Sequence, residues 1–181
     1  MSKKIIIYIA GPRVFYPYAA EDGKRKKEIC AKYGLEGLYP LDNEIDFGPV
    51  KGENSKKIAR GNEDYIRVSH ITVADLTPFR GAEPDSGTCY EMGFSRGIGH
   101  PVYAYVPHKL RTHEVVSKYY GPVSKVGEDY FDKNGARIEG FGHQINLMLQ
   151  HGATVVIEGG TFEDCIRQIH EDMDNGVLII E

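Results

Sequence analysis

Residues 69–75 read Ser-His-Ile-Thr-Val-Ala-Asp, a short run of small and β-branched residues that ends on a carboxylate. Three other runs share this character, at residues 5–10, 101–106 and 153–157. Short apolar runs without polar alternation are typical of parallel strands that are buried on both faces. The four runs therefore predict a parallel β-sheet at the centre of the protein.

Stretches with helical character separate these runs. Strands that alternate with helices indicate βαβ units, whose crossovers place helices on both faces of a parallel sheet. We therefore predict an α/β fold, a doubly wound, flavodoxin-like (Rossmann-like) parallel sheet in one domain of residues 1–181. Residues 107–140 are expected to form a long excursion, packed on the domain edge or against another subunit. The expected helices are residues 19–33, 55–68, 91–98, 144–150 and 161–175.

The bulk composition excludes several classes of partner. A formal net charge of -4 argues against a nucleic-acid-binding surface, which needs dense Lys and Arg. The first apolar run is too short for a membrane span and lacks the layout of a signal peptide. Three widely separated cysteines fit a reducing compartment and form no metal-ligand spacing. We expect a cytoplasmic protein that binds neither nucleic acid nor membrane.

Three loops next to the predicted strands carry unusual residues. Open parallel sheets bind ligands outside the carboxyl ends of their strands. Residues 11–15 follow the first strand, residues 75–88 follow the second, and residues 139–148 precede the fourth. No G-x-G-x-x-G sequence follows the first strand, which excludes a Rossmann dehydrogenase. These loops are the expected ligand site.

The loop of residues 75–88 is rich in acids and leads into a helix with Glu91 in its first turns. Ser86 or Thr88 is expected to cap this helix. The helix dipole favours negative charge near its start, at Asp85 and Glu91, so we expect Glu91 to be ionised, as a nucleophilic carboxylate must be. An isolated acid at a helix start more often only stabilises its helix. Whether Glu91 is a nucleophile therefore has to be judged from the surrounding motif.

Residues 74–102 read A-D-L-T-P-F-R-G-A-E-P-D-S-G-T-C-Y-E-M-G-F-S-R-G-I-G-H-P-V. This segment closely resembles the nucleoside 2-deoxyribosyltransferase family, in the branch with the P-F-R-G-x-E-P-D-x-G-T-x-x-E-x-G signature. Two more segments are similar to family motifs: Y-I-A-G-P-R-V-F at residues 8–15 and E-G-F-G-H-Q-I-N-L-M-L at residues 139–149. Three motifs in order, spread over residues 5–150, make a coincidence very improbable.

The resemblance implies transfer of deoxyribose between bases by double displacement, with retention, through a covalent deoxyribosyl ester of Glu91. It implies that Tyr8 orients this nucleophile and that Asp85 accepts hydrogen bonds from the sugar hydroxyls. It also implies that Asn146 enters the site of a neighbouring subunit to bind the 5′-hydroxyl, with Met148 beside it. The expected protein is thus a homo-oligomer, a dimer or a larger assembly such as a hexamer.

The base is expected to lie against Phe15 and the loop that begins at Gly11, since flat heterocycles stack well on aromatic rings. Asn62 stands where relatives place an Asp or an Asn that faces the base. An amide cannot act as a general acid, which leaves Glu63, Asp64 or a water molecule to protonate the departing base. The resemblance favours purines among the free nucleobases and deoxynucleosides that are the expected ligands.

Two alternatives stay open at this point. The first is an N-glycosidase that hydrolyses deoxynucleosides or their 5′-monophosphates with the same nucleophile. A phosphate cradle needs Ser, Arg and backbone amides, whereas residues 11–19 contain one Arg, no Ser and two prolines. The second is a non-catalytic nucleotide-sensing module, which need not keep Glu91, Asp85, Tyr8 and Asn146 together. The expected chemistry needs no metal and no organic cofactor.

Overall fold

The computed structural model describes residues 4–44 and 49–180, and its centre is a five-stranded parallel sheet with the order β2-β1-β3-β4-β8. This is the flavodoxin-like α/β architecture that the sequence predicts. All four apolar runs form strands. The five strands are β1 (Ile6–Ala10), β2 (Glu36–Leu38), β3 (Ile71–Asp75), β4 (Val102–Val106) and β8 (Val155–Glu158).

The edge strand β2 was not predicted from the sequence. It has only three residues, Glu36, Gly37 and Leu38, and glycine is a poor strand former. Its backbone pairs with β1, with Gly37 opposite Ile7. A Cβ on Gly37 would lie 3.0 Å from the side chain of Ile9, so the glycine lets β2 pack closely. Tertiary pairing, and not local propensity, makes this strand.

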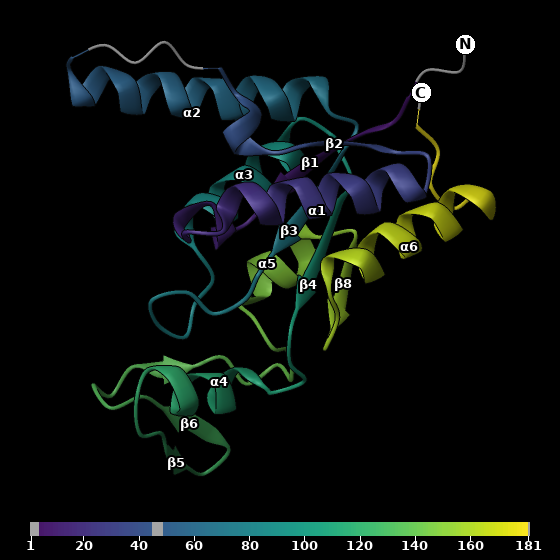
Figure 1. The fold of residues 1–181 in the computed structure, drawn as a ribbon. Coiled ribbons are helices and arrows are strands. Elements are labelled where there is room, and N and C mark those ends of the chain that lie inside the picture. Colours follow the sequence, from purple (N-terminus) through teal and green to yellow (C-terminus); the bar gives the residue numbers. More distant parts are fainter. Residues whose placement is uncertain (1–3, 45–48, 181) are drawn as a thin grey trace.

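Helices cover both faces of the sheet, as expected (Figure 1). α1 and α6 pack against each other on one face, and α2, α3 and α5 cover the other. α2 and α3 begin four or five residues earlier than the sequence suggested, and α5 begins three residues later. The bounds are α1 (Ala19–Lys32), α2 (Lys51–Val68), α3 (Ser86–Gly97), α5 (Leu147–Gly152) and α6 (Phe162–Asp174).

Alternate residues of β1 serve the two faces, because side chains along a strand point in opposite directions. Ile7 and Ile9 belong to the hydrophobic cluster under α1 and α6. Tyr8 and Ala10 belong to the cluster under α2 and α3. Tyr8 is fully buried on this second face, so its hydroxyl points toward the two helices that carry Asn62 and Glu91.

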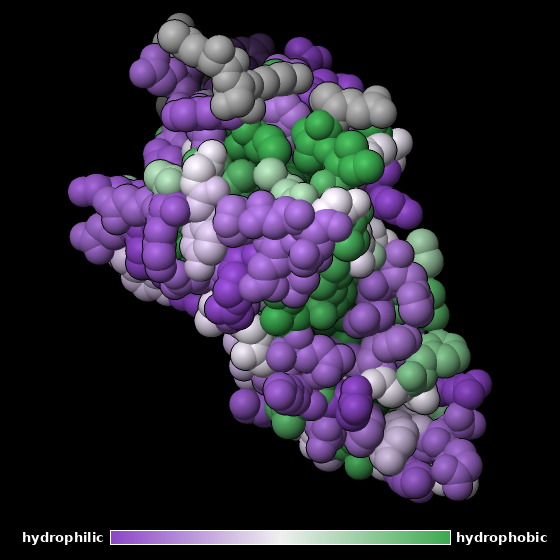
Figure 2. All heavy atoms as spheres, turned by 90° about the vertical axis from the view of Figure 1, so that its right-hand side faces the viewer, coloured by the Kyte–Doolittle hydropathy of each residue, from purple (hydrophilic) through white to green (hydrophobic). Residues whose placement is uncertain are grey.

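The excursion after β4 forms a smaller lobe with its own secondary structure. It contains α4 (Thr112–Tyr119) and a three-stranded antiparallel sheet of β5 (Ser124–Val126), β6 (Asp129–Phe131) and β7 (Arg137–Ile138). The lobe projects from the carboxyl end of the parallel sheet (Figure 1). Seen from the side that carries α6, it extends well away from the body of the protein (Figure 2). The chain leaves the lobe just before α5.

No helix in the described part of the chain is both long and apolar enough to cross a membrane.

Candidate active site

A cavity of about 400 Å³ opens at the carboxyl ends of β1 and β3. The sheet grows from β1 toward β2 on one side and toward β3 on the other, and ligands bind at such a switch point. The loop after β1, the short 3-10 helix at Pro40–Asp42, α2 and the start of α3 form its walls. The lining residues are Gly11, Val14, Phe15, Pro40, Leu41, Asn43, Ile58, Asn62, Asp85, Gly87, Thr88 and Glu91.

The structure thus brings together five residues that the sequence singled out: Gly11, Phe15, Asn62, Asp85 and Glu91. They come from positions up to 80 residues apart in the chain. The sequence did not point to Val14, Leu41, Asn43 or Ile58. The turn formers Pro40, Asp42 and Asn43 could have marked a loop at a strand end, but the strand before them, β2, was not recognised.

Asp85 is the N-cap of α3, so the expectation that Ser86 or Thr88 caps this helix was wrong. The Oδ2 atom of Asp85 accepts hydrogen bonds from the backbone N–H of Thr88, at 2.9 Å, and from its hydroxyl, at 3.1 Å. Capping in this way orients the Asp85 carboxyl at the cavity wall. Glu91 is the sixth residue of the helix, about one turn beyond the capped N–H of Thr88.

The carboxyl group of Glu91 is held from two sides. Its Oε1 atom accepts a hydrogen bond from the hydroxyl of Tyr8 at 2.7 Å and another from Nδ2 of Asn62 at 3.2 Å. No described residue donates a hydrogen bond to Oε2. The two donors therefore fix the orientation of the carboxyl group and leave Oε2 as the oxygen that can meet a ligand.

Burial raises the pKa of Glu91 to about 7, and the negative charge of Asp85 adds to this rise. The hydrogen bonds from Tyr8 and Asn62 oppose the rise, because they stabilise the ionised form. Burial and the Glu91 carboxylate raise the pKa of Tyr8 well above its usual range, so Tyr8 remains a donor. We expected the helix dipole to keep Glu91 ionised, but desolvation has the larger effect on its pKa. The dipole acts mainly within the first turn of a helix, and Glu91 lies beyond that turn.

Gly11 allows the loop after β1 to lie directly on Asp75. A Cβ on Gly11 would be 2.8 Å from the Cβ of Asp75, closer than real side chains approach. The Asp75 carboxyl is fully buried, accepts a hydrogen bond from the N–H of Thr77 at 3.0 Å, and lies 3.6 Å from Nε of Arg13. This carboxyl group therefore ties the loop after β1 to the loop after β3.

Phe15 forms the aromatic side of the cavity, and Phe79, which lies outside the cavity lining, stacks on it. The rings of Phe15 and Phe79 stack with their centroids 5.5 Å apart and an angle of 18° between their planes. The guanidinium group of Arg80 lies 5.3 Å from the Phe15 centroid and 4.6 Å from the Phe79 centroid. Phe15 keeps 57% of its surface exposed, which leaves room for a flat ligand against it.

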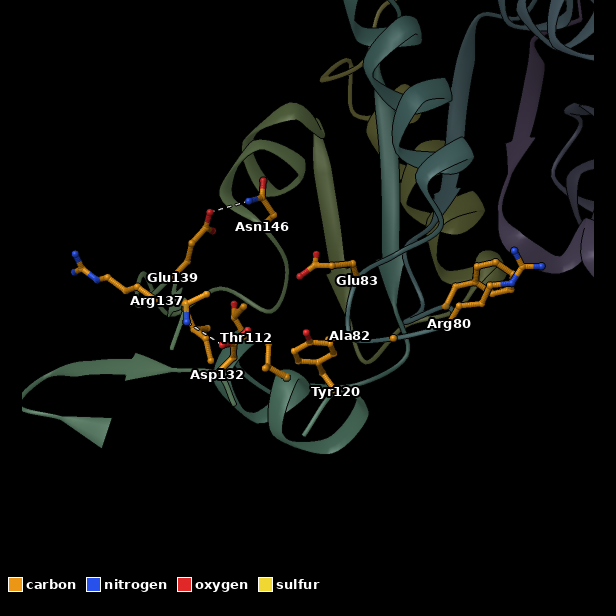
Figure 3. Close-up of a pocket in the computed structure, with 14 residues that line it drawn as sticks. Arg80, Ala82, Glu83, Thr112, Tyr120, Asp132, Arg137, Glu139 and Asn146 are labelled. Carbon is orange, nitrogen blue, oxygen red and sulfur yellow. Dashed lines mark hydrogen bonds between the residues drawn. The ribbon is translucent and has the colours of Figure 1, made fainter. Parts of the chain in front are cut away.

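Asn146 and Met148 do not reach this cavity within one chain. Asn146 lines a second cavity, of about 500 Å³, between residues 79–83 and the smaller lobe (Figure 3). Its Nδ2 donates a hydrogen bond to Glu139 at 2.7 Å, and its Oδ1 caps α5 by accepting one from the N–H of Met148 at 2.9 Å. Met148 is 72% exposed.

The described residues contain no group of three or more His, Cys, Asp or Glu side chains that could hold a metal ion. The three cysteines are free thiols.

Comparison with known proteins agrees with this geometry. The family model described as nucleoside 2-deoxyribosyltransferase matches residues 7–148, and the chain belongs to that family. The protein is thus an enzyme of a family that acts on nucleosides and bases. The matched segment contains every cavity residue named above and Tyr8.

Two solved structures and one curated protein illustrate the relationship. The 2-desoxiribosyltransferase from Leishmania mexicana is 30% identical, with a TM-score of 0.71 over 92% of this chain and 97% of that one. A 2-deoxyribosyltransferase from Bacillus psychrosaccharolyticus shares the fold at 18% identity, with a TM-score of 0.54 over 88% of each chain. An uncharacterised protein of Schizosaccharomyces pombe is 31% identical over 116 residues, 59% of this chain; the match spans 55% of that protein's length.

Proposed function

We propose that the protein transfers the 2-deoxyribosyl group from one nucleobase to another, through a covalent ester on Glu91 and with retention at C1′. The observation that carries this proposal is the carboxyl group of Glu91, whose Oε1 is fixed by Tyr8 and Asn62 while Oε2 is left for a ligand. It lies in a cavity with an aromatic wall at Phe15 and a second carboxylate at Asp85. These are the parts that transfer of a glycosyl group with retention requires.

In the first step Oε2 attacks C1′ of a bound deoxynucleoside, and the bond from C1′ to the base nitrogen breaks. The electron pair of that bond leaves with the base, which takes up a proton. Asn62 cannot supply it, because an amide is not a general acid. Glu63 and Asp64 do not line the cavity, and Glu63 accepts a hydrogen bond from the hydroxyl of Tyr90 at 2.5 Å. We assign the proton to a water molecule.

In the second step a nitrogen of the incoming base attacks C1′, Glu91 leaves as a carboxylate, and the N–H proton of that base returns to the hydroxide that the water molecule became in the first step. Two inversions give net retention. The hydrogen bonds from Tyr8 and Asn62 to Oε1 strengthen as charge returns to the carboxylate, so they lower the barrier to its departure. The second base must arrive faster than water does, and the apolar wall of Val14, Leu41 and Ile58 helps to exclude water.

The substrate contacts follow from the same geometry. Asp85 uses Oδ2 to cap α3, which leaves Oδ1 to accept a hydrogen bond from a deoxyribose hydroxyl. Phe15 stacks on the base, and a purine covers more of that ring than a pyrimidine does. A 2′-hydroxyl group would destabilise the oxocarbenium-like transition state, so the preferred sugar is 2-deoxyribose.

The site is completed by a second copy of the chain in this proposal. Asn146 and Met148 lie away from Glu91 within one chain, and Met148 exposes most of its side chain. A neighbouring subunit that presents its Asn146 to the cavity would supply the polar contact for the 5′-hydroxyl. The active form is therefore a homo-oligomer, a dimer or larger, acting on free nucleosides and bases in the cytoplasm.

The test separates transfer from hydrolysis. The protein is incubated with deoxyinosine and adenine, and separately with deoxyinosine alone, and products are separated by chromatography. Formation of deoxyadenosine faster than release of free deoxyribose supports the proposal, and a mass increase of one deoxyribosyl group on Glu91 supports the covalent step. Release of deoxyribose without deoxyadenosine would instead favour the N-glycosidase alternative. The same incubations are made with Glu91→Gln, which should form no deoxyadenosine. Glu158→Gln, which makes the same change at an exposed acid, is the matched control.

A further inference from the structure

Glu139 is an acid in the wall of the second cavity, and the proposed reaction gives it no role. It follows β7 directly, and its carboxyl group accepts two hydrogen bonds from the start of α5. Oε1 accepts one from Nδ2 of Asn146 at 2.7 Å (Figure 3), and Oε2 accepts one from the backbone N–H of Leu147 at 2.8 Å. One side chain therefore joins the two ends of the loop of residues 139–147.

The two contacts require a carboxylate. Both partners of Glu139 are N–H donors, so each oxygen of its carboxyl group has to act as an acceptor. Hydrogen bonds to an ionised acceptor are short and strong, in line with the two observed distances. A glutamine at this position has one oxygen and one amino group, so it would set a donor against one of the two donors.

Glu139 also fixes which way the Asn146 amide points. Nδ2 uses one of its two hydrogens for Glu139, and Oδ1 uses one of its acceptor sites for the N–H of Met148 at 2.9 Å. A flipped amide would place its oxygen against the carboxylate and its amino group against the N–H. One hydrogen of Nδ2 and one acceptor site of Oδ1 therefore remain for a further partner, in a fixed orientation.

The segment around Asn146 is already held in place within one chain. The carbonyl oxygen of His143 accepts hydrogen bonds from the N–H of Thr112, at 3.0 Å, and from its hydroxyl, at 2.9 Å. Ile145 is buried in the cluster under α2 and α3. Asn146 is only half-buried, and Met148, two residues further on, is 72% exposed. Because the loop is held before any partner arrives, presenting Asn146 to one costs little ordering entropy.

We propose that Glu139 is a positioning residue, which holds the Asn146 amide in the orientation that binds the 5′-hydroxyl group in the neighbouring subunit's cavity. This inference rests on the proposed function and deepens it. A 5′-hydroxyl group both donates and accepts, which matches the acceptor site and the N–H that Asn146 has left. Glu139 itself touches no substrate. Each complete site then depends on Glu91 of one subunit and on Glu139 of the next.

The experiment compares two donors that differ only at the 5′ position, deoxyinosine and 2′,5′-dideoxyinosine, with adenine as the acceptor in both cases. The ratio of their kcat/KM values measures the contact with the 5′-hydroxyl group. The wild type should prefer deoxyinosine by roughly tenfold, as one hydrogen bond allows, and Glu139→Gln should lose most of this preference. A merely structural role would lower both values by the same factor, because inactive protein cancels from the ratio.

Two further variants define the path of the effect. Glu128→Gln makes the same chemical change in the same lobe, at a side chain that is 99% exposed, and its ratio should equal that of the wild type. Asn146→Ala should lose the preference for deoxyinosine. Adding Glu139→Gln to Asn146→Ala should not change the ratio further, because Glu139 acts through Asn146. A further change in the double variant would contradict the proposed path.

Mixed assemblies test from which subunit Glu139 acts. Chains with Glu91→Gln lack the nucleophile but keep Glu139 and Asn146. When Glu139→Gln chains are co-produced with an excess of Glu91→Gln chains, each cavity that keeps its nucleophile has an intact loop on the neighbouring subunit. The ratio should then return to the wild-type value. A ratio that stays at the value of Glu139→Gln alone overturns the inference.

The failure of this inference and the failure of the proposed function give different results. A wild-type ratio near one, or a Glu139→Gln ratio equal to that of the wild type, overturns the role of Glu139 while transfer by Glu91 stands. If the wild type transfers deoxyribose from neither donor, the proposed function itself fails.

Discussion

Replacing Glu91 by Gln should abolish transfer and, at the same time, stabilise the folded protein at alkaline pH. Burial raises the pKa of the Glu91 carboxyl from its ordinary value of 4.5 to about 7. A carboxyl group whose pKa is higher in the folded state contributes stability below its unfolded pKa and loses that contribution as the pH rises through the folded value. The native protein therefore carries an unfavourable charge in its active site above pH 7.

The size of the effect follows from the two pKa values. Each unit of difference corresponds to about 1.4 kcal/mol, so a buried charge at Glu91 costs about 3 kcal/mol at pH 8 and less than about 1 kcal/mol at pH 5. Gln keeps an oxygen that can accept from Tyr8 and Asn62 but carries no charge. The stability gained by Glu91→Gln should therefore be larger at pH 8 than at pH 5 by about 2 kcal/mol.

Urea unfolding of both proteins at pH 5 and pH 8 measures this difference. Glu158→Gln makes the same chemical change at an exposed position and should show no pH-dependent gain. Equal stabilisation of Glu91→Gln at both pH values, or destabilisation at pH 8, would refute the assignment of a buried, desolvated carboxyl group at this position. Retention of transfer activity would refute its role as the nucleophile.

Further predictions concern the same site. The wild-type kcat/KM should rise with pH along a limb with an apparent pKa of about 7, since Glu91 reacts as a carboxylate, and a flat profile between pH 5 and 8 would contradict this. Tyr8→Phe removes a donor to that carboxylate, so steady-state rates should fall roughly 10- to 100-fold and the limb should move to higher pH. Asp85→Asn keeps a capping oxygen but removes a charge; its stability should stay within about 0.5 kcal/mol of wild type, while KM rises and the limb moves to lower pH. Gly11→Ala should destabilise the fold by about 1–3 kcal/mol in urea titrations, whereas Gly93→Ala, which has open space at its Cβ, should not.

Most strands of the parallel sheet could be predicted, because strands that are buried on both faces appear in the sequence as short apolar runs. Strands β1, β3 and β4 are largely apolar, since nearly all their residues are buried beneath the helices on the two faces, and the edge strand β8 is apolar over its three half-buried residues, Val155, Val156 and Ile157. No such apolar run marks β2, which is a strand because its backbone pairs with β1. Apolar runs do not mark the strands of the smaller lobe either, because the residues of β5 are exposed and those of β6 are only half-buried.

The candidate site divides in the same way. Glu91, Asp85 and Asn62 were identified by their places in motifs, and the structure brings them to one cavity. Nothing in the sequence pointed to Asn43 as a lining residue, because its place in the cavity wall depends on packing against Gly61 of α2, 18 residues away in the chain. It also suggested the wrong cap for α3, because Asp85, Ser86 and Thr88 are all good capping residues and only the backbone geometry selects one of them.

The sequence by itself determined the class of fold and the family, and it led to the prediction that Glu91 is the nucleophile, because each depends on residue types in local order. Only the tertiary structure decided the protonation of Glu91. Glu91 comes three residues after Thr88, whose backbone N–H is capped by Asp85, and this position in the helix suggests no unusual pKa. Its pKa is raised because a strand and two helices remove it from water, and it is held by donors from β1 and α2 that lie 83 and 29 residues away in the chain. Desolvation is a property of the assembled environment, and no single segment of the chain contains it.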